Sequence, residues 1–277
     1  MRLFYATIAA AVFFVASLPA FAQRDQDKLD ALFDAMGLAE MIEILRAEGL
    51  VHGSEVAQQM LPGGREARWD ALVSDIYDPQ VMYEEVRAAF DEELAGDDVD
   101  AMLGFFQSET GRTIVSLETS ARRAFLDQAV EEASKEQAAL AAADKTDRFQ
   151  QVTRFIETGD LIEANIVGAM NSNYAFLSGL IDGGAMPEGL TAETALQQVW
   201  QQEAEIRATT REWLYAYLML AFQPLSEEEL EAYITFTASP AGQDLNNALF
   251  VAFDGMFDDV SRALGLGASR FVISREL

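Results

Sequence analysis

The same residue types recur in this chain at one fixed spacing. Four pairs lie 131 positions apart, namely Trp69 and Trp200, Phe105 and Phe236, Ser108 and Ser239, and Gly111 and Gly242. A single offset shared by such different residues indicates two tandem copies of one structural unit. Because these residue types cap, bend and pack helices, the repeat predicts architecture and does not by itself indicate chemistry.

The second copy carries the clearer helix signals. Ser226 and Glu229 form the pattern of a capping box, in which each side chain binds the backbone N–H of the other. The helix that follows should end before Ser239, because the residue before a proline disfavours helical backbone. Pro240 then fits the first position of a new helix, with Ser239 as its N-cap and Gly242 in its first turn. Since glycine weakens a helix, Gly242 predicts a sharp corner at which two backbones approach closely.

The first copy repeats this design with weaker signals. An apolar stripe precedes Ser108, which should cap the next helix, and Gly111 follows in the first turn of that helix. Upstream, Asp78 and the proline after it predict another helix start. Thr209 stands 131 positions after Asp78 and forms a second capping-box pattern with Glu212, which predicts a helix start at Thr209 as well.

The other segments also show helical patterns, and no hairpin dipeptide lies between alternating apolar runs. His52 and Gly53 predict the end of one helix, and residues 112–142 predict one continuous helix. The most polar break in the chain is residues 144–147. We therefore expect an all-α fold made of two related helical-bundle units in tandem, over residues 23–143 and 144–277.

The first 22 residues have the pattern of a secretory signal peptide. Arg2 precedes an apolar run from Leu3 to Leu18, and Ala20-Phe21-Ala22 supplies a small-x-small cleavage site. Later in the chain no run of about 18 apolar residues occurs, so we expect no integral membrane segment after cleavage. The expected location is the periplasm, or the medium after secretion.

One stretch of the second copy matches a known pattern. Glu228 to Gln243 begins with acidic residues, and the residues that match the pattern are Phe236, Ser239, Pro240, Gly242 and Leu245. This stretch resembles the bacterial exported helical family called domain of unknown function 2059. The resemblance covers about 60 residues of the second copy and about 50 of the first.

The two copies depart from the family pattern at one position each. Thr237 stands where the family has a second aromatic residue, and Glu109 stands where the family has proline. The first copy otherwise retains Phe105, Ser108 and Gly111. Because the family has no established activity, the resemblance implies a fold and a compartment and transfers no catalytic role.

Composition excludes several classes of function. The chain has 46 acidic and 19 basic residues and a formal net charge of −27, so nucleic acid and anionic membrane surfaces should repel it. His52 is the single histidine and there is no cysteine, so no multi-histidine metal site and no cysteine nucleophile can form. Neither a Gly-x-Ser-x-Gly elbow nor a Ser-x-x-Lys dyad is present. We expect no metal, no cofactor and no catalytic site.

Two groups of residues leave alternatives open. Asp254 and Asp258, four positions apart on a helix, have the spacing to hold a divalent cation, although a solvated acidic face is the simpler interpretation. The aromatic residues of the repeat either line a pocket or, as helical spacing favours, belong to the core. The ligand-binding residues are not identified by the sequence.

The function that the sequence favours is that of an exported, non-catalytic helical protein that binds a protein or a cell-envelope component. A self-associating structural protein is the first alternative, and the oligomeric state stays open. A hydrolase that attacks envelope polymers with a pair of carboxylates is the second alternative, because acidic residues are abundant.

Overall fold

The computed structural model describes residues 20–61, 67–96, 98–185 and 191–273, and these residues form α-helices without a β-strand. The predicted all-α class is confirmed. The helices are α1 (Ala20–Ala35), α2 (Leu38–Met60), α3 (Ala67–Ile76), α4 (Pro79–Glu93), α5 (Val99–Phe106), α6 (Glu109–Ala124), α7 (Gln128–Asp144), α8 (Asp147–Thr158), α9 (Leu161–Asp182), α10 (Ala192–Ala221), α11 (Glu227–Thr237) and α12 (Pro240–Ile273).

The predicted signal peptide lies almost wholly outside the described residues, which begin at Ala20. Within the described ranges, no helix combines the length and the apolar character that crossing a bilayer requires. The prediction of a cleaved signal peptide over residues 1–22 therefore stays a prediction.

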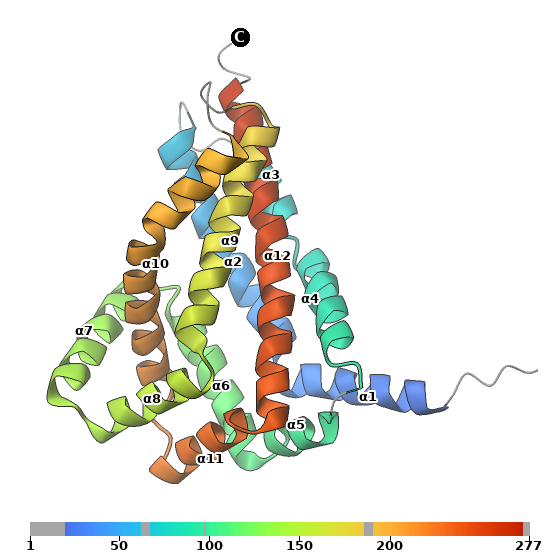
Figure 1. The fold of residues 1–277 in the computed structure, drawn as a ribbon, viewed down its shortest axis with the longest axis vertical. Helices are drawn as coiled ribbons and strands as arrows, with labels where there is room; N and C mark the ends of the chain where they lie inside the picture. The colour runs from blue at the N-terminus through green and yellow to red at the C-terminus, as the bar shows by residue number, and fades with distance from the viewer. Residues whose placement is uncertain (1–19, 62–66, 97, 186–190, 274–277) are drawn as a thin grey trace, which may run out of the picture.

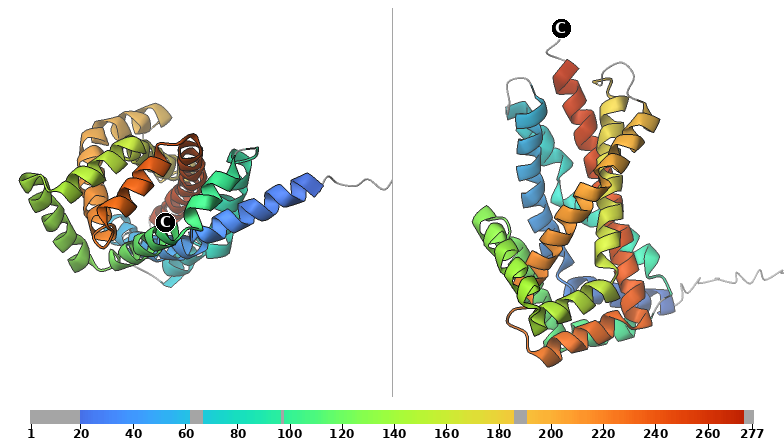
Figure 2. Two further views of the ribbon diagram at one scale, coloured as in Figure 1. Left: turned by 90° about the horizontal axis from the view of Figure 1, so that it is seen from below. Right: turned by 60° about the vertical axis from the view of Figure 1, so that its left-hand side comes forward.

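The molecule is broad at one end and narrow at the other. The long helices α2, α9, α10 and α12 run from the broad end towards the narrow end, where α3 also lies (Figure 1). The short helices α5, α8 and α11 lie across the broad end, as the two further views also show (Figure 2). The loops that join α5 to α6 and α11 to α12 therefore both lie at the broad end.

The capping interactions expected at these two corners are confirmed. Ser239 Oγ accepts a hydrogen bond from the backbone N–H of Gly242 at 3.1 Å, and Ser108 Oγ accepts one from Gly111 at 3.0 Å. Ser226 and Glu229 form both hydrogen bonds of the capping box at the start of α11. The local sequence thus fixes where these helices begin.

The two corners share a second feature, which is the close approach of backbones. A Cβ atom added to Gly242 would overlap the carbonyl oxygen of Phe236, at the end of the preceding helix. A Cβ atom added to Gly111 would overlap the carbonyl oxygen of Phe105 in the same way. Only glycine leaves room for this approach, so both glycines are required by the turn between the helices.

The apolar side chains form two buried cores. The first core takes its members mainly from α1 to α5 and α12, with Leu180 of α9, and the second takes them mainly from α6, α8, α10 and α11, with Ala138 of α7. The two helices that meet at each corner therefore belong to different cores. At the first corner α5 packs in the first core and α6 in the second, and at the second corner α12 packs in the first core and α11 in the second. Both cores combine helices from the two sides of residue 144.

Aromatic rings join the two cores. The rings of Phe105 and Phe236 stack with a centroid distance of 4.3 Å and an interplanar angle of 6°. Phe105 also stacks on Tyr233 at 5.4 Å, and both of these residues pack against both cores. Offset stacking of this kind adds about 0.5–1.5 kcal/mol to the free energy gained by burying the rings.

The pair α9 and α12 is held by a second close approach. A Cβ atom on Gly179 would overlap the carbonyl oxygen of Arg262, and one on Gly265 would overlap that of Phe176. The glycines thus let the backbones of two long helices touch, and α12 in turn packs against α4 on another side. In this way α12 links the helices before residue 144 to those after it.

The predicted helix start at Thr209 is wrong. Residues 192–221 form one continuous helix, α10, and Thr209 lies in its interior. The Thr209 hydroxyl donates to the backbone carbonyls of Glu205 at 3.0 Å and Ile206 at 3.1 Å. No proline or glycine interrupts α10, so the helix continues through Thr209. The Thr209 hydroxyl is satisfied by backbone carbonyls of the preceding turn and does not cap a helix.

The tryptophan pair of the repeat is not equivalent in the structure. Trp69 is 0% exposed and donates a hydrogen bond from Nε1 to the Gly53 carbonyl at 2.7 Å, whereas Trp200 is 63% exposed. His52 and Gly53 also lie within α2 instead of ending a helix. A Cβ atom on Gly53 would overlap Val73, so this glycine serves the packing of α2 on α3.

We predict opposite effects for two glycine-to-alanine substitutions in α12. Gly242→Ala should lower the free energy of unfolding by about 1–3 kcal/mol, because the new methyl group overlaps the Phe236 carbonyl. Gly255→Ala is the control, since nothing lies within 4 Å of its added Cβ, and it should stabilise the protein by about 0.5–1 kcal/mol. Thermal unfolding followed by circular dichroism measures both changes. Equal melting temperatures for the two variants would contradict the corner geometry.

Candidate functional site

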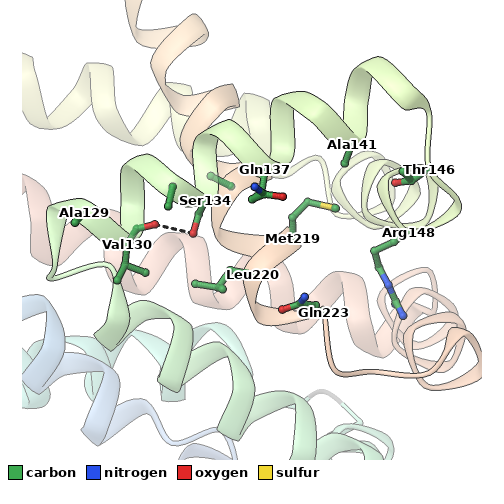
Figure 3. A pocket seen from close by; sticks show the side chains of 12 residues that line it. Ala129, Val130, Ser134, Gln137, Ala141, Thr146, Arg148, Met219, Leu220 and Gln223 are labelled. Atoms are coloured by element: carbon green, nitrogen blue, oxygen red, sulfur yellow. Dashed lines mark hydrogen bonds between the residues drawn. The ribbon is translucent and has the colours of Figure 1, made fainter.

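A cavity of about 740 Å³ lies between α7 and α10 (Figure 3). Its volume falls within the range of about 300–1,000 Å³ that small-molecule sites occupy. The residues that line it are Ala129, Val130, Ala133, Ser134, Gln137 and Ala141 of α7, Thr146 and Arg148 at the start of α8, Ala216, Met219 and Leu220 of α10, and Gln223 just after it. We call this cavity the α7–α10 groove.

The groove exists because α7 presents small side chains to α10. Ala129, Ala133 and Ala141 face it from α7, and their methyl groups are too short to fill the space between the two helices. The buried residues of α7 are Ser134 and Ala138. Because the side chains of α7 at this contact are small, a space remains between α7 and α10, and this space is the groove.

The polar groups of the groove are few. Ser134 Oγ donates a hydrogen bond to the Val130 carbonyl at 2.8 Å, so its proton is already used within α7 (Figure 3). Met219 and Leu220 form the apolar wall on α10, between the two ends of the groove. Methionine adapts its shape readily, which suits a surface that receives apolar ligands.

Arg148 is the one charged side chain among the described residues that line the groove. Its Nη2 donates to the backbone carbonyl of Leu225, while its Nη1 is buried and has no hydrogen-bond partner. No ion pair within the described ranges includes this guanidinium. Because Nη1 is buried, it is not open to the groove, and Gln151 Oε1, three residues further along α8, is a buried acceptor that also lacks a partner.

The residues that the sequence singled out lie elsewhere. Phe105, Ser108, Gly111, Phe236, Ser239, Pro240 and Gly242 occupy the two helix corners, and none of them lines the α7–α10 groove. Of the aromatic residues considered for a pocket, Phe105 and Phe236 pack against the cores and Trp69 is buried in the first core. Their positions are those of structural residues.

The sequence did not reveal the groove, because it predicted one helix over residues 112–142. In the structure α6 ends at Ala124 and α7 begins at Gln128. Asp127 caps α7 by accepting a hydrogen bond from the backbone N–H of Ala129 at 2.9 Å. That N-cap pattern, together with alanines on one face of the next helix, was the signal that would have located the groove.

The acidic pair Asp254 and Asp258 packs against α9 instead of facing open solvent. Burial, with the neighbouring charge of Asp258 added, raises the pKa of Asp254 to about 6. Ser172 donates a hydrogen bond to Asp258 at 3.3 Å, and burial raises the pKa of Asp258 as well. Across the described residues, no three or more His, Cys, Asp or Glu side chains come together in an arrangement that would hold a metal ion.

A second buried carboxyl lies between the cores. Tyr233 Oη donates to Glu118 Oε1 at 3.3 Å, and Tyr217 Oη donates to the backbone carbonyl of Glu118 at 3.1 Å. Burial raises the pKa of Glu118 to about 7, against the opposing effect of the Tyr233 hydrogen bond. Glu118 does not line the α7–α10 groove, so a ligand in that groove has no contact with it.

Nearby, Arg122 binds Glu48 through two hydrogen bonds of 2.6 Å and lies over the ring of Trp213 at 4.7 Å. This bidentate pair ties α6 to α2, and the ring of α10 covers it. Such an arrangement is typical of a structural ion pair, because both partners are satisfied by each other.

We predict that acidification from about pH 7.5 to about pH 5.5 raises the melting temperature by a few degrees. The folded-state pKa is about 7 for Glu118 and about 6 for Glu85 and Asp254, all raised chiefly by burial, whereas unfolded carboxyls titrate near 4. The folded state therefore binds these protons more tightly. Their contribution is complete below about pH 4 and is lost as the pH rises through 6 to 7.

Circular dichroism melts across this pH range measure the effect. Glu118→Gln should reduce the difference between the two melting temperatures, whereas Glu136→Gln, at an exposed position of α7, should leave it unchanged. A melting temperature that stays constant or falls on acidification would contradict the prediction.

One family model matches part of the chain. The family described as "Uncharacterized protein conserved in bacteria (DUF2059)" matches residues 80–139, which run from the first turn of α4 to the later part of α7. No curated protein and no solved structure matches the chain. The match contains the first corner, with Phe105, Ser108 and Gly111, and the second corner lies outside it. Residues 80–139 are therefore similar to this bacterial family.

Proposed function

We propose that this is an exported, non-catalytic helical protein that binds a component of the bacterial cell envelope in the α7–α10 groove. The observation that carries the proposal is the groove itself, a cavity of about 740 Å³ that is lined largely by apolar side chains. Export is supported by the signal-peptide pattern of residues 1–22.

The residues that line the groove support a binding function better than a catalytic one. Catalysis of acyl or glycosyl transfer needs a nucleophile or a pair of acids within reach of the substrate. The described lining offers alanine, valine, leucine and methionine with a few neutral polar groups and Arg148. A concave, mainly apolar surface with a few polar groups is typical of a recognition site.

We also propose that the two corners descend from one duplicated unit, with residues 23–143 and 144–277 as its copies. Both corners have a serine cap, a glycine beneath a carbonyl and a phenylalanine at the same relative position. The stack of Phe105 on Phe236 resembles a two-fold contact, in which a residue meets its own equivalent. In addition, α6 of the first copy packs in the second core, and α12 of the second copy packs in the first core. This exchange of helices is similar to domain swapping between two protomers.

Self-association is the second candidate function. Leu196 and Trp200 lie one helical turn apart on α10 and are 46% and 63% exposed. An exposed apolar pair of this kind would be covered in a dimer. Sedimentation at micromolar concentration separates the two functions, because a monomer would remove self-association and leave groove binding intact.

We predict that a photo-reactive residue at Gln137 captures an envelope component in intact cells. Gln137 lies in the lining and is exposed, so a reactive group there reaches a bound molecule. Ala133→Phe should abolish the capture, because the ring fills the groove, whereas Ala139→Phe places the same ring at an exposed position of α7 outside the lining. Mass spectrometry identifies the captured molecule. Capture that survives Ala133→Phe, or is lost equally with Ala139→Phe, would overturn the proposed site.

A further inference from the structure

Another cavity, of about 370 Å³, lies where α2, α9, α10 and α12 meet, and its described lining has no residue in common with that of the α7–α10 groove. Its volume is within the range of about 300–1,000 Å³ that small-molecule sites occupy. Four of the residues that line it carry side-chain amides, namely Gln59 of α2, Asn173 of α9, and Gln198 and Gln202 of α10. We call this cavity the amide pocket, and we propose that it binds a neutral saccharide.

The lining of the amide pocket favours an uncharged ligand. Although 23% of the residues in the chain are charged, no Asp, Glu, Lys or Arg occurs among the described residues that line this pocket. An anion would find no cation to pair with there, and the net charge of −27 would repel it. A cation would find no carboxylate in this lining and would bind better to the acidic residues that are exposed elsewhere on the surface.

The amides favour a ligand that is rich in hydrogen-bonding groups. All four are exposed, and within the described ranges none of them forms a side-chain hydrogen bond with the protein. Each offers a carbonyl acceptor and two N–H donors, which bind water until a ligand displaces it. A purely apolar ligand would remove this water and leave the amides without partners, which is unfavourable. Ser172 adds an acceptor, because its own proton is donated to Asp258 at 3.3 Å.

Apolar side chains form another part of the lining. Phe176 and Leu177 of α9 are half-buried and pack against the first core, and Met60 of α2 is 36% exposed. A sugar ring carries hydroxyl groups around its edge and C–H groups on its faces. One face can therefore pack against these apolar side chains while the hydroxyl groups bind the amides, so a sugar ring matches both parts of the lining.

A short neutral peptide is the nearest competitor, because it is also uncharged and rich in hydrogen-bonding groups. When a peptide binds, the backbone dihedrals of each residue become ordered, and this ordering costs conformational entropy. A sugar ring is already rigid, so it loses less entropy for the same number of hydrogen bonds. In a pocket of about 370 Å³ there are few contacts to offset the larger cost, and this difference favours the saccharide.

Neighbouring glutamines of α10 provide a matched test. Gln198 and Gln202 line the amide pocket, whereas Gln197 and Gln201 are exposed on the same helix and lie outside the lining. Three neutral disaccharides, N,N′-diacetylchitobiose, cellobiose and maltose, are titrated into the purified protein and followed by ligand-observed NMR, with acetyl-trialanine amide as the neutral peptide. We expect at least one disaccharide to bind with a Kd of about 1 mM or below, and more tightly than the peptide.

The double variant Gln198→Ala, Gln202→Ala should weaken this binding about tenfold, because two amides that hold the ligand are lost. The double variant Gln197→Ala, Gln201→Ala should leave the binding unchanged. Melting temperatures show that each variant is folded at the temperature of the assay. Ala133→Phe fills the α7–α10 groove and should also leave the binding unchanged, so the failure of either site leaves the other standing.

Four results would overturn the inference. The first is that none of the three disaccharides binds at concentrations up to about 10 mM. The second is that the two double variants bind the disaccharide equally well. The third is that Ala133→Phe abolishes the binding, which would place the saccharide in the α7–α10 groove. The fourth is that the peptide binds more tightly than every disaccharide, which would identify the pocket as a peptide site.

Discussion

The fold depends on the close contact at the two helix corners, where a glycine lies directly beneath the carbonyl group of a phenylalanine. The rings of these two phenylalanines, Phe105 and Phe236, then stack on each other at 4.3 Å. Because the carbonyl and the ring belong to the same residue, any displacement at Gly111 or Gly242 would move a ring of the stack. The corners direct α5 and α12 to one core and α6 and α11 to the other, so a local turn determines how the whole chain divides its apolar surface.

The position of the groove follows from that division. The large side chains of the second core include Phe155 of α8, Phe222 just after α10 and Leu230 of α11, whereas α7 adds Ala138. Because the residues of α7 that face α10 are small, the two helices leave a space between them, and this space is the α7–α10 groove.

Features that depend on residues close together in the sequence were predicted correctly, whereas features that depend on distant residues were not. The caps at Ser226 and Ser239 were predicted correctly, because their partners lie three residues away and the chemistry is local. Thr209 has an equally good local pattern, but it lies within α10, where the whole helix packs against α9 and α6 and local capping has no role. The burial of Trp69 and the exposure of Trp200 likewise depend on which helices lie opposite, and a repeat offset carries no such information. The groove was missed for the same reason, since its walls come from segments about 80 residues apart.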